Sequence, residues 1–204
     1  MKLKSICYSY QSNNFAIILN SCYESNYNII SKNGKFKVPL QKHRDLAIDI
    51  IKTFTGIEKD VLHDDYGMPY LQGNNWNISI SHSEGLVAVI FDSQKVTGVD
   101  IQVIRDNIAS LKNKFMSDQE IEEAAINYYA NSSFLHVYWG AKETLYKIYS
   151  KGQLNFKKDL YVHPFVYNGK GVITAEIIKK DYQRIYYLWY EKIEQSILVY
   201  LMND

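Results

Sequence analysis

The chain has 204 residues, of which 47% are hydrophobic and 22% are charged, as in an ordinary soluble globular protein. Its 23 Lys and Arg residues nearly balance its 22 Asp and Glu residues, so no charge excess favours binding to nucleic acid or to a membrane surface. The two cysteines, Cys7 and Cys22, lack the spacing of a metal site. We expect them to be free thiols in a reducing compartment.

The first residues do not have the pattern of a signal peptide. Residues 1–4 are basic, but residues 10–14 are polar and the apolar run at residues 15–19 is short. No stretch of the sequence approaches the length of about 18 apolar residues that spans a bilayer. We therefore expect a cytoplasmic protein.

The first half of the chain predicts strands around one convincing helix. Residues 2–10 and 15–19 resemble short strands, and residues 20–33 resemble irregular surface. After Pro39, apolar residues recur at helical spacing until Gly56, as in a helix with one buried face. A turn-rich loop containing Tyr66, Gly67, Met68 and Pro69 follows. Three β-rich runs with short gaps then predict an antiparallel meander, at residues 76–81, 86–91 and 96–101.

The second half repeats this plan in altered order. Ser117 and Glu120 have the spacing of a capping box, which predicts a helix to about Tyr129. Ser132 or Ser133 is expected to cap a second helix that stops near Gly152. Further antiparallel strands are predicted at residues 161–166, 172–178, 185–189 and 196–202. We expect an α+β fold of two similar subdomains in a pseudo-twofold arrangement, residues 1–102 and 103–204, each a small antiparallel sheet packed on a long helix.

The second helix carries an unusual set of side chains. Trp139, Glu143 and Lys147 are spaced four residues apart and share one face, which Lys142 borders. The simplest interpretation is a surface ion pair between Glu143 and Lys147, with a value of about 0.3–0.5 kcal/mol. Trp139 on the same face argues against it, because an indole is unfavourable in water. Glu143 is therefore expected at a partly buried site.

A second acid, Asp100, follows the apolar run that includes Val99 and precedes Ile101. It is either a strand-end acid that caps a turn or a ligand mounted beside a helix. Together with Glu143 it would supply hard oxygen ligands, which suit Mg²⁺ rather than zinc.

A third cluster, Ser81-His82-Ser83, is expected at the end of a strand, on a tight turn before Glu84-Gly85. A lone His in a turn is most often only a turn residue. Hydroxyls, an imidazole and backbone N–H groups together nevertheless supply hydrogen-bond donors that can bind an anion. A hydrolase nucleophile is weakly supported, because the sequence has no Gly-x-Ser-x-Gly motif.

In this order, four motifs resemble those of 4′-phosphopantetheinyl transferases of the Sfp type: Tyr66-Gly67-x-Pro69, Ile80-Ser81-His82-Ser83, Gly98-Val99-Asp100-Ile101 and Trp139-x-x-Lys142-Glu143-x-x-x-Lys147. Weaker matches to the same family are His43-Arg44, Phe115-Met116-Ser117-x-x-Glu120 and Lys151-Gly152-x-Leu154. The matches extend from about residue 43 to residue 154.

The resemblance implies transfer of the phosphopantetheine arm of coenzyme A to a serine of an apo acyl or peptidyl carrier protein, with release of 3′,5′-ADP. It implies a Mg²⁺ ion, with Mn²⁺ as the alternative, held by Asp100 and Glu143 at a site between the two subdomains, and with Gln102 as a weak or water-mediated ligand. The catalytic residues that it implies are Glu143, Lys142, Lys147 and Glu120. Proton removal from the serine is left open among Glu143, Glu120 and a metal-bound water.

The resemblance places coenzyme A mainly on the first subdomain. Arg44, Ser81 and His82 would bind the 3′-phosphate, and Gly67, Met68 and Pro69 would lie along the adenine. Lysines near the helix motif would attract an acidic carrier protein, although ordinary solvated lysines are an equal interpretation: Lys112, Lys114, Lys147, Lys151, Lys157 and Lys158. We expect a monomer, because two similar halves already enclose the site.

Two residues depart from the family pattern. Gln102 stands where many members have an acid, and Met68 stands where the family usually has Lys or Arg. These departures favour one alternative, a catalytically weak or inactive module that binds coenzyme A or a carrier protein. A Mg²⁺-dependent phosphohydrolase is a third interpretation. The sequence does not identify the carrier, which could serve fatty acid, polyketide or peptide synthesis.

Overall fold

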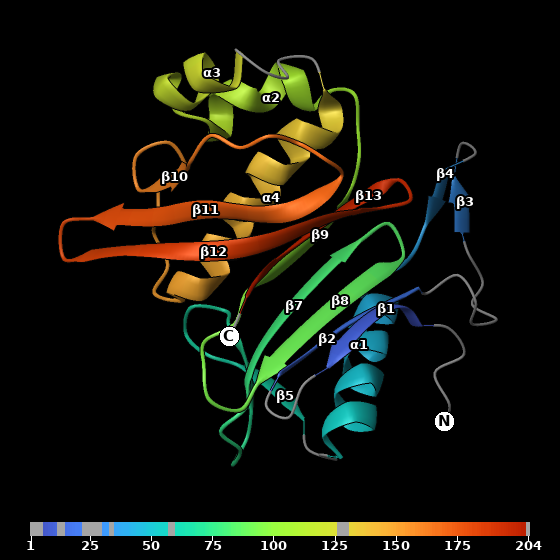
Figure 1. The fold of residues 1–204 in the computed structure, drawn as a ribbon. Helices are drawn as coiled ribbons and strands as arrows, with labels where there is room; N and C mark the ends of the chain where they lie inside the picture. The colour runs from blue at the N-terminus through green and yellow to red at the C-terminus, as the bar shows by residue number, and fades with distance from the viewer. Residues whose placement is uncertain are drawn as a thin grey trace. The chain divides into compact units, whose positions relative to one another are not determined.

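The computed structural model describes residues 6–11, 15–21, 30–32, 35–56, 60–125 and 131–202. The chain divides into two compact units, an N-terminal unit of Met1–Ile101 and a C-terminal unit of Gln102–Asp204. Each unit contains an antiparallel sheet together with one or more helices (Figure 1). The predicted α+β class is therefore confirmed.

The helix of the N-terminal unit, α1 (Leu40–Thr55), forms where the apolar spacing predicted it. It follows Pro39 and ends at Gly56, which has a φ of 68° and donates its N–H to the Lys52 carbonyl at 3.0 Å. This left-handed conformation suits glycine. The helix buries one face, which consists of His43, Leu46, Ala47, Ile50 and Ile51.

The main sheet of this unit has six strands in the order β1-β2-β8-β7-β6-β5. They are β1 (Ile6–Gln11), β2 (Phe15–Ser21), β5 (Val61–His63), β6 (Pro69–Leu71), β7 (Asn77–Ser83) and β8 (Leu86–Asp92). The strands β3 (Ile30–Lys32) and β4 (Lys35–Lys37) form a separate hairpin. The core lies where α1 packs on β8, with Ile50 and Ile51 against Val87, Val89 and Phe91.

Two predictions for the N-terminal unit differ from the structure. The turn-rich loop before residue 76 contains the short strands β5 and β6. The third strand of the expected meander is displaced to β9 (Val99–Val103), which joins β13 in the other sheet rather than β8. Asp92 explains part of the difference, because its carboxylate accepts N–H groups from Gln94 and Lys95 at 2.7 and 2.8 Å and so forms a turn at the end of β8.

Some predicted segments lie wholly or partly outside the described residues. These are residues 2–5 of the first predicted strand, most of the irregular segment 20–33, and the end of the first helix of the second half, residues 126–129.

The sheet of the C-terminal unit has five strands in the order β10-β11-β12-β13-β9. Its other members are β10 (Leu160–Val162), β11 (Lys170–Lys179), β12 (Tyr182–Ile193) and β13 (Ser196–Leu201). Neighbouring strands from β10 to β13 are antiparallel, as predicted. The predicted strand at residues 161–166 is shorter in the structure, because β10 ends at Val162.

Three helices accompany this sheet: α2 (Ile108–Phe115), α3 (Asp118–Ala125) and α4 (Ser132–Tyr149). The sequence did not predict α2. The capping box before α3 is confirmed, because Ser117 Oγ accepts from the Glu120 N–H at 3.2 Å and Glu120 Oε2 accepts from the Ser117 N–H at 2.7 Å. None of the helices in the described residues has the length and apolar composition needed to cross a membrane.

The start of α4 is capped by a residue other than the predicted ones, while its end lies near Gly152, as predicted. Asn131 caps the start, because its side chain accepts from the Phe134 N–H at 3.1 Å, where Ser132 or Ser133 was expected. The helix ends at Ser150, with a φ of 52°, two residues before Gly152. Asparagine and serine are both preferred at a helix N-cap, so the sequence did not distinguish Asn131 from the two serines that follow it.

The core of the C-terminal unit lies between α4 and the sheet, with Leu145 and Val137 of the helix packed in the same cluster as Val199 of β13. The helix packs tightly on β13 at Gly140. A Cβ atom on this residue would lie 2.8 Å from Val199 Cγ2, nearer than real carbon contacts allow. Glycine is therefore required for the distance between α4 and β13.

Candidate active site

Asp100 is in contact with a serine on strand β7. Asp100 is only 7% exposed, and its Oδ1 atom accepts a hydrogen bond from Ser81 Oγ at 2.9 Å. The same hydroxyl accepts from the Ile101 N–H at 3.2 Å. The Ser81 hydroxyl therefore bridges the Asp100 carboxyl group and the backbone of β9.

Ser79 makes an equivalent contact two residues earlier on β7. Its hydroxyl accepts from the Val99 N–H at 3.3 Å. Two serine hydroxyls of β7 thus accept hydrogen bonds from two backbone N–H groups of β9. Asp100 and Ser81 are therefore in direct contact, although the sequence motifs predicted different ligands for them, a metal ion for Asp100 and the 3′-phosphate of coenzyme A for Ser81.

The Ser81-His82-Ser83 cluster lies at the end of a strand and before Glu84-Gly85, as expected, but its residues pair within β7 rather than standing on the turn itself. These three residues pair with Ala88, Val87 and Leu86 of β8. The two-residue turn is Glu84-Gly85, with φ values of 42° and 89°, as in a tight hairpin. Strand alternation explains why Ser81 is buried and His82 is exposed.

His82 stacks on His43 of α1, with ring centroids 4.7 Å apart and ring planes 24° apart. His43 is 6% exposed, and its Nε2 atom accepts from the Gly85 N–H at 3.0 Å, so this nitrogen carries no proton. Burial and the charge of His82 lower the pKa of His43, while the nearby Pro39 backbone opposes this shift. The sequence motif assigned a role only to its neighbour Arg44, which is exposed.

The segment at residues 64–68 is an ordered turn between β5 and β6. Asp64 Oδ1 accepts from the N–H groups of Tyr66 and Met68 at 2.9 and 2.8 Å. Gly67 has a φ of 79°, which favours glycine, and donates to the Asp64 carbonyl at 2.9 Å. Pro69 is the first residue of β6. The three residues expected along an adenine thus share one short hairpin.

In the C-terminal unit, α4 presents the predicted face of Trp139, Glu143 and Lys147. All three side chains are half-buried, whereas the intervening residues Gly140, Ala141 and Lys142 are buried. Trp139 packs edge-on against Phe115 with ring centroids 5.1 Å apart. Glu143 therefore lies at a partly buried position.

Gln102 reaches the same helix. Its Nε2 atom lies 3.3 Å from the point where a Cβ atom on Gly140 would stand. Gly140 and Glu143 are three residues apart and occupy neighbouring turns of one helix surface. The amide thus contacts α4 at Gly140, three residues before Glu143 in the sequence.

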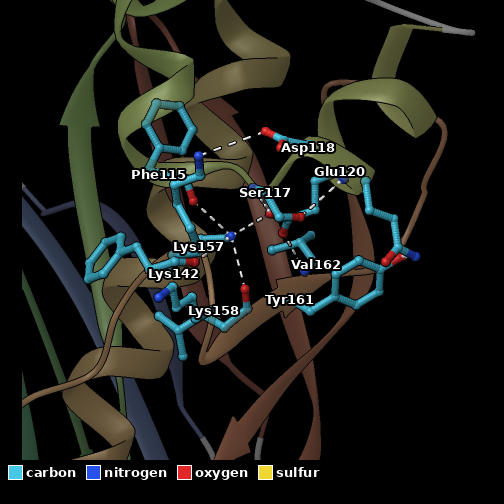
Figure 2. Close-up of polar contacts among 12 residues, drawn as sticks. Phe115, Ser117, Asp118, Glu120, Lys142, Lys157, Lys158, Tyr161 and Val162 are labelled. Atoms are coloured by element: carbon cyan, nitrogen blue, oxygen red, sulfur yellow. Dashed lines mark hydrogen bonds and ion pairs between the residues drawn. The ribbon is translucent and has the colours of Figure 1, made fainter.

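Lys142 and Glu120 occupy the interior of the C-terminal unit (Figure 2). Both side chains are 0% exposed, and Lys142 Nζ lies 2.6 Å from Glu120 Oε2. Burial lowers the pKa of Lys142, and the charge of Glu120 and their hydrogen bond oppose this shift. The motifs predicted catalytic roles for Lys142 and Glu120. No pattern in the sequence predicted that both side chains are buried.

The oxygen atoms of Asp100, Glu143 and Gln102 are of the type that binds a hard cation, but the described residues do not gather enough of them into one metal-binding cluster. Among the described residues, no group of three or more His, Cys, Asp or Glu side chains is arranged to hold a metal ion. Asp100 belongs to the N-terminal unit, and Glu143 belongs to the C-terminal unit. Carboxylate and amide oxygens still fit Mg²⁺, which usually takes one or two carboxylates and completes its shell with water and phosphate oxygens.

One comparison with known proteins decides the family. The model of the 4′-phosphopantetheinyl transferase superfamily matches residues 97–201. The chain belongs to this superfamily. The matched segment contains Asp100, Gln102 and Glu143, while the residues expected to bind coenzyme A precede it. No curated protein matches the chain at a significant level.

Membership of the phosphopantetheinyl transferase superfamily supports a transferase activity of this general kind. It also implies coenzyme A and a carrier protein as the partners. The mixed α+β architecture of two antiparallel sheets with helices is consistent with the fold of the superfamily.

Proposed function

We propose that the protein is a Mg²⁺-dependent 4′-phosphopantetheinyl transferase of the Sfp type, acting on a serine of an apo acyl or peptidyl carrier protein. The observation that carries this proposal is the presence of both motif acids, Asp100 and Glu143, within the segment that matches the superfamily. Support also comes from the first unit, where Ser81 orients Asp100 as an acceptor at 2.9 Å.

The reaction places two requirements on the protein. The serine oxygen forms a bond to the phosphorus nearest pantetheine, the bond from this phosphorus to the bridging pyrophosphate oxygen breaks, and 3′,5′-ADP leaves. A serine proton must be removed, and negative charge on the leaving phosphate must be neutralised. A Mg²⁺ ion held by Asp100 and Glu143 would neutralise charge on the pyrophosphate. Lys147, on the face of Glu143, is proposed to contact a phosphate oxygen.

The coenzyme A contacts are proposed for the N-terminal unit. Arg44 and His82 are both exposed and have the charge or donor capacity to bind the 3′-phosphate. His43 connects α1, which carries Arg44, to β7, which carries His82, because it precedes Arg44 on the helix and its ring stacks on that of His82. The Gly67–Pro69 hairpin is proposed to lie along the adenine.

Proton removal is assigned to Glu143 or to a metal-bound water. Glu120 is a poorer base, because it is 0% exposed and both of its oxygens accept hydrogen bonds within the protein. A general base must come within hydrogen-bond reach of the serine hydroxyl. The half-buried position of Glu143 permits this approach.

The proposal is tested by incubating the protein with an apo carrier protein, coenzyme A and Mg²⁺ and then measuring the mass of the carrier. We expect the mass of one phosphopantetheine group on the carrier and release of 3′,5′-ADP. The absence of an adduct with several carriers, in Mg²⁺ and in Mn²⁺, would contradict the proposal. Release of free phosphate from coenzyme A would instead indicate a phosphohydrolase.

Gln102 favours one alternative function, a weak or inactive module that binds coenzyme A or a carrier protein. An amide oxygen adds no charge to a cation site, so metal affinity is expected to be lower than with a third acid. Binding of coenzyme A by calorimetry without any carrier adduct would support this alternative. A carrier adduct formed at multiple turnovers would exclude it.

A further inference from the structure

We propose that Lys142 and Glu120 form a positioning pair that fixes the rotation of α4, and with it the direction of Glu143, without touching any substrate. This inference rests on the proposed function, because it assigns Glu143 as the group to be positioned. It replaces the catalytic roles that the sequence motif suggested for Lys142 and Glu120.

The contacts of Lys142 leave it no proton for a phosphate. Its Nζ atom lies 2.6 Å from Glu120 Oε2 and within 2.7 to 3.0 Å of three backbone carbonyls. The carbonyls belong to Phe115, Phe156 and Leu160. An ammonium has three N–H groups, and four protein acceptors already surround it (Figure 2).

The carboxylate oxygens of Glu120 also have all their hydrogen bonds within the protein. Its Oε2 atom accepts from Lys142 and from the Ser117 N–H at 2.7 Å, and its Oε1 atom accepts from the Val162 N–H at 2.9 Å. The carboxylate therefore joins the start of α3 to β10. Since both oxygens are occupied and buried, a substrate hydroxyl has no access to this acid in the structure.

The pair ties α4 to three other parts of the C-terminal unit. These are the end of α2 at Phe115, the start of α3 at Glu120 and the segment from Phe156 to β10. Lys142 and Glu143 are adjacent on the helix, about 100° apart around its axis. Holding Lys142 toward the interior therefore turns Glu143 to the half-buried face, together with Trp139.

The test compares Lys142→Met, Glu120→Gln and the double variant Glu120→Gln/Lys142→Met. Each single change leaves one buried charge without its partner, whereas the double change removes both charges. Asp118→Asn is the matched control, because Asp118 pairs with Lys157 at 3.8 Å on the exposed surface of the same region. For each protein we would measure Mn²⁺ affinity, coenzyme A affinity without metal, and kcat for carrier modification.

We expect each single variant to lose at least tenfold in Mn²⁺ affinity and in kcat, with less than a twofold change in coenzyme A affinity. The double variant should return to within fivefold of the wild-type Mn²⁺ affinity, and Asp118→Asn should match the wild type. A tenfold loss of coenzyme A affinity in Lys142→Met and in the double variant would overturn the proposal, since it would mean that Lys142 contacts the ligand. Folded single variants with unchanged Mn²⁺ affinity would also overturn it.

A second readout separates this inference from the proposed function. The protein labelled with 5-fluorotryptophan gives a ¹⁹F resonance for Trp139, assigned with Trp139→Phe, which reports the face that carries Glu143. We expect the single variants to shift this resonance and the double variant to restore it. If the wild-type protein modifies no carrier, the proposed function is contradicted, but the ¹⁹F resonance still tests the positioning role. If the single variants do not shift the resonance, the positioning role is contradicted. If a single variant does not fold, the double variant still tests the proposal, because its coenzyme A affinity and its Mn²⁺ affinity are predicted to stay close to those of the wild type.

Discussion

The Ser81 hydroxyl donates to Asp100 Oδ1 at 2.9 Å and accepts from the next N–H of β9 at 3.2 Å. One serine thus orients the acid that is proposed as a metal ligand. Ligands of metals are commonly oriented by such neighbours, and removing the neighbour lowers metal affinity by about 10- to 100-fold.

We therefore predict that Ser81→Ala lowers Mn²⁺ affinity by about tenfold, the lower end of the range for orienting groups. Ser79→Ala is the matched control, because Ser79 is on the same strand and contacts the Val99 N–H rather than the acid. Titration followed by electron paramagnetic resonance measures both. Equal losses in the two variants would show that a strand contact, and not the orientation of Asp100, sets the affinity.

Changing Gly140 to alanine should destabilise the protein. The added Cβ would lie 2.8 Å from Val199 Cγ2, and overpacking of this kind costs about 1–3 kcal/mol. Urea unfolding measures the change in the free energy of unfolding. Adding Val199→Ala to Gly140→Ala should cost less than the sum of the two single changes, because it removes the carbon that clashes. Additive costs would contradict a direct contact.

Gln102→Glu should raise Mn²⁺ affinity by about tenfold, since a third carboxylate adds charge to the proposed cation site. Gln119→Glu is a control, because Gln119 lies on α3 and bonds to Glu123 and Tyr161 instead. Calorimetric titration with Mn²⁺ compares the two variants. An unchanged affinity in Gln102→Glu would place Gln102 outside the cation site.

The stability of the protein should depend on pH through His43. Burial lowers the pKa of His43 below its ordinary value of 6.5, so the unfolded chain binds this proton more readily than the folded chain. Stability is therefore lost as the pH falls below about 6.5. His43→Phe retains a ring to stack on His82 but does not titrate, so its unfolding free energy should fall less over the same interval. Parallel pH profiles for the two proteins would contradict this.

The residues that sequence predicted best are those with local signals. The apolar spacing of Ile50 and Ile51 marked the buried face of α1, and the reciprocal bonds of Ser117 and Glu120 appear as the capping box implied. Trp139 correctly indicated that the face of Glu143 is not fully exposed. Each of these signals depends on neighbours within about four residues.

The features that sequence missed depend on distant partners. The gap before β9 resembled a hairpin loop, yet the strand joins β13, almost a hundred positions further along the chain. The depth of Lys142 depends on carbonyls of Phe115, Phe156 and Leu160. The role of His43 depends on Gly85, which donates to it from the hairpin turn. No local pattern encodes these contacts.

The most direct test of the proposed metal site measures carrier modification and Mn²⁺ binding together in Asp100→Ala and Glu143→Ala. Asp106→Ala and Glu122→Ala are the matched controls, because both acids are exposed. We predict that the first two variants form no phosphopantetheine adduct and lose Mn²⁺ binding, while the controls keep both. Adduct formation at the wild-type rate by either Asp100→Ala or Glu143→Ala would contradict a cation shared by these two acids.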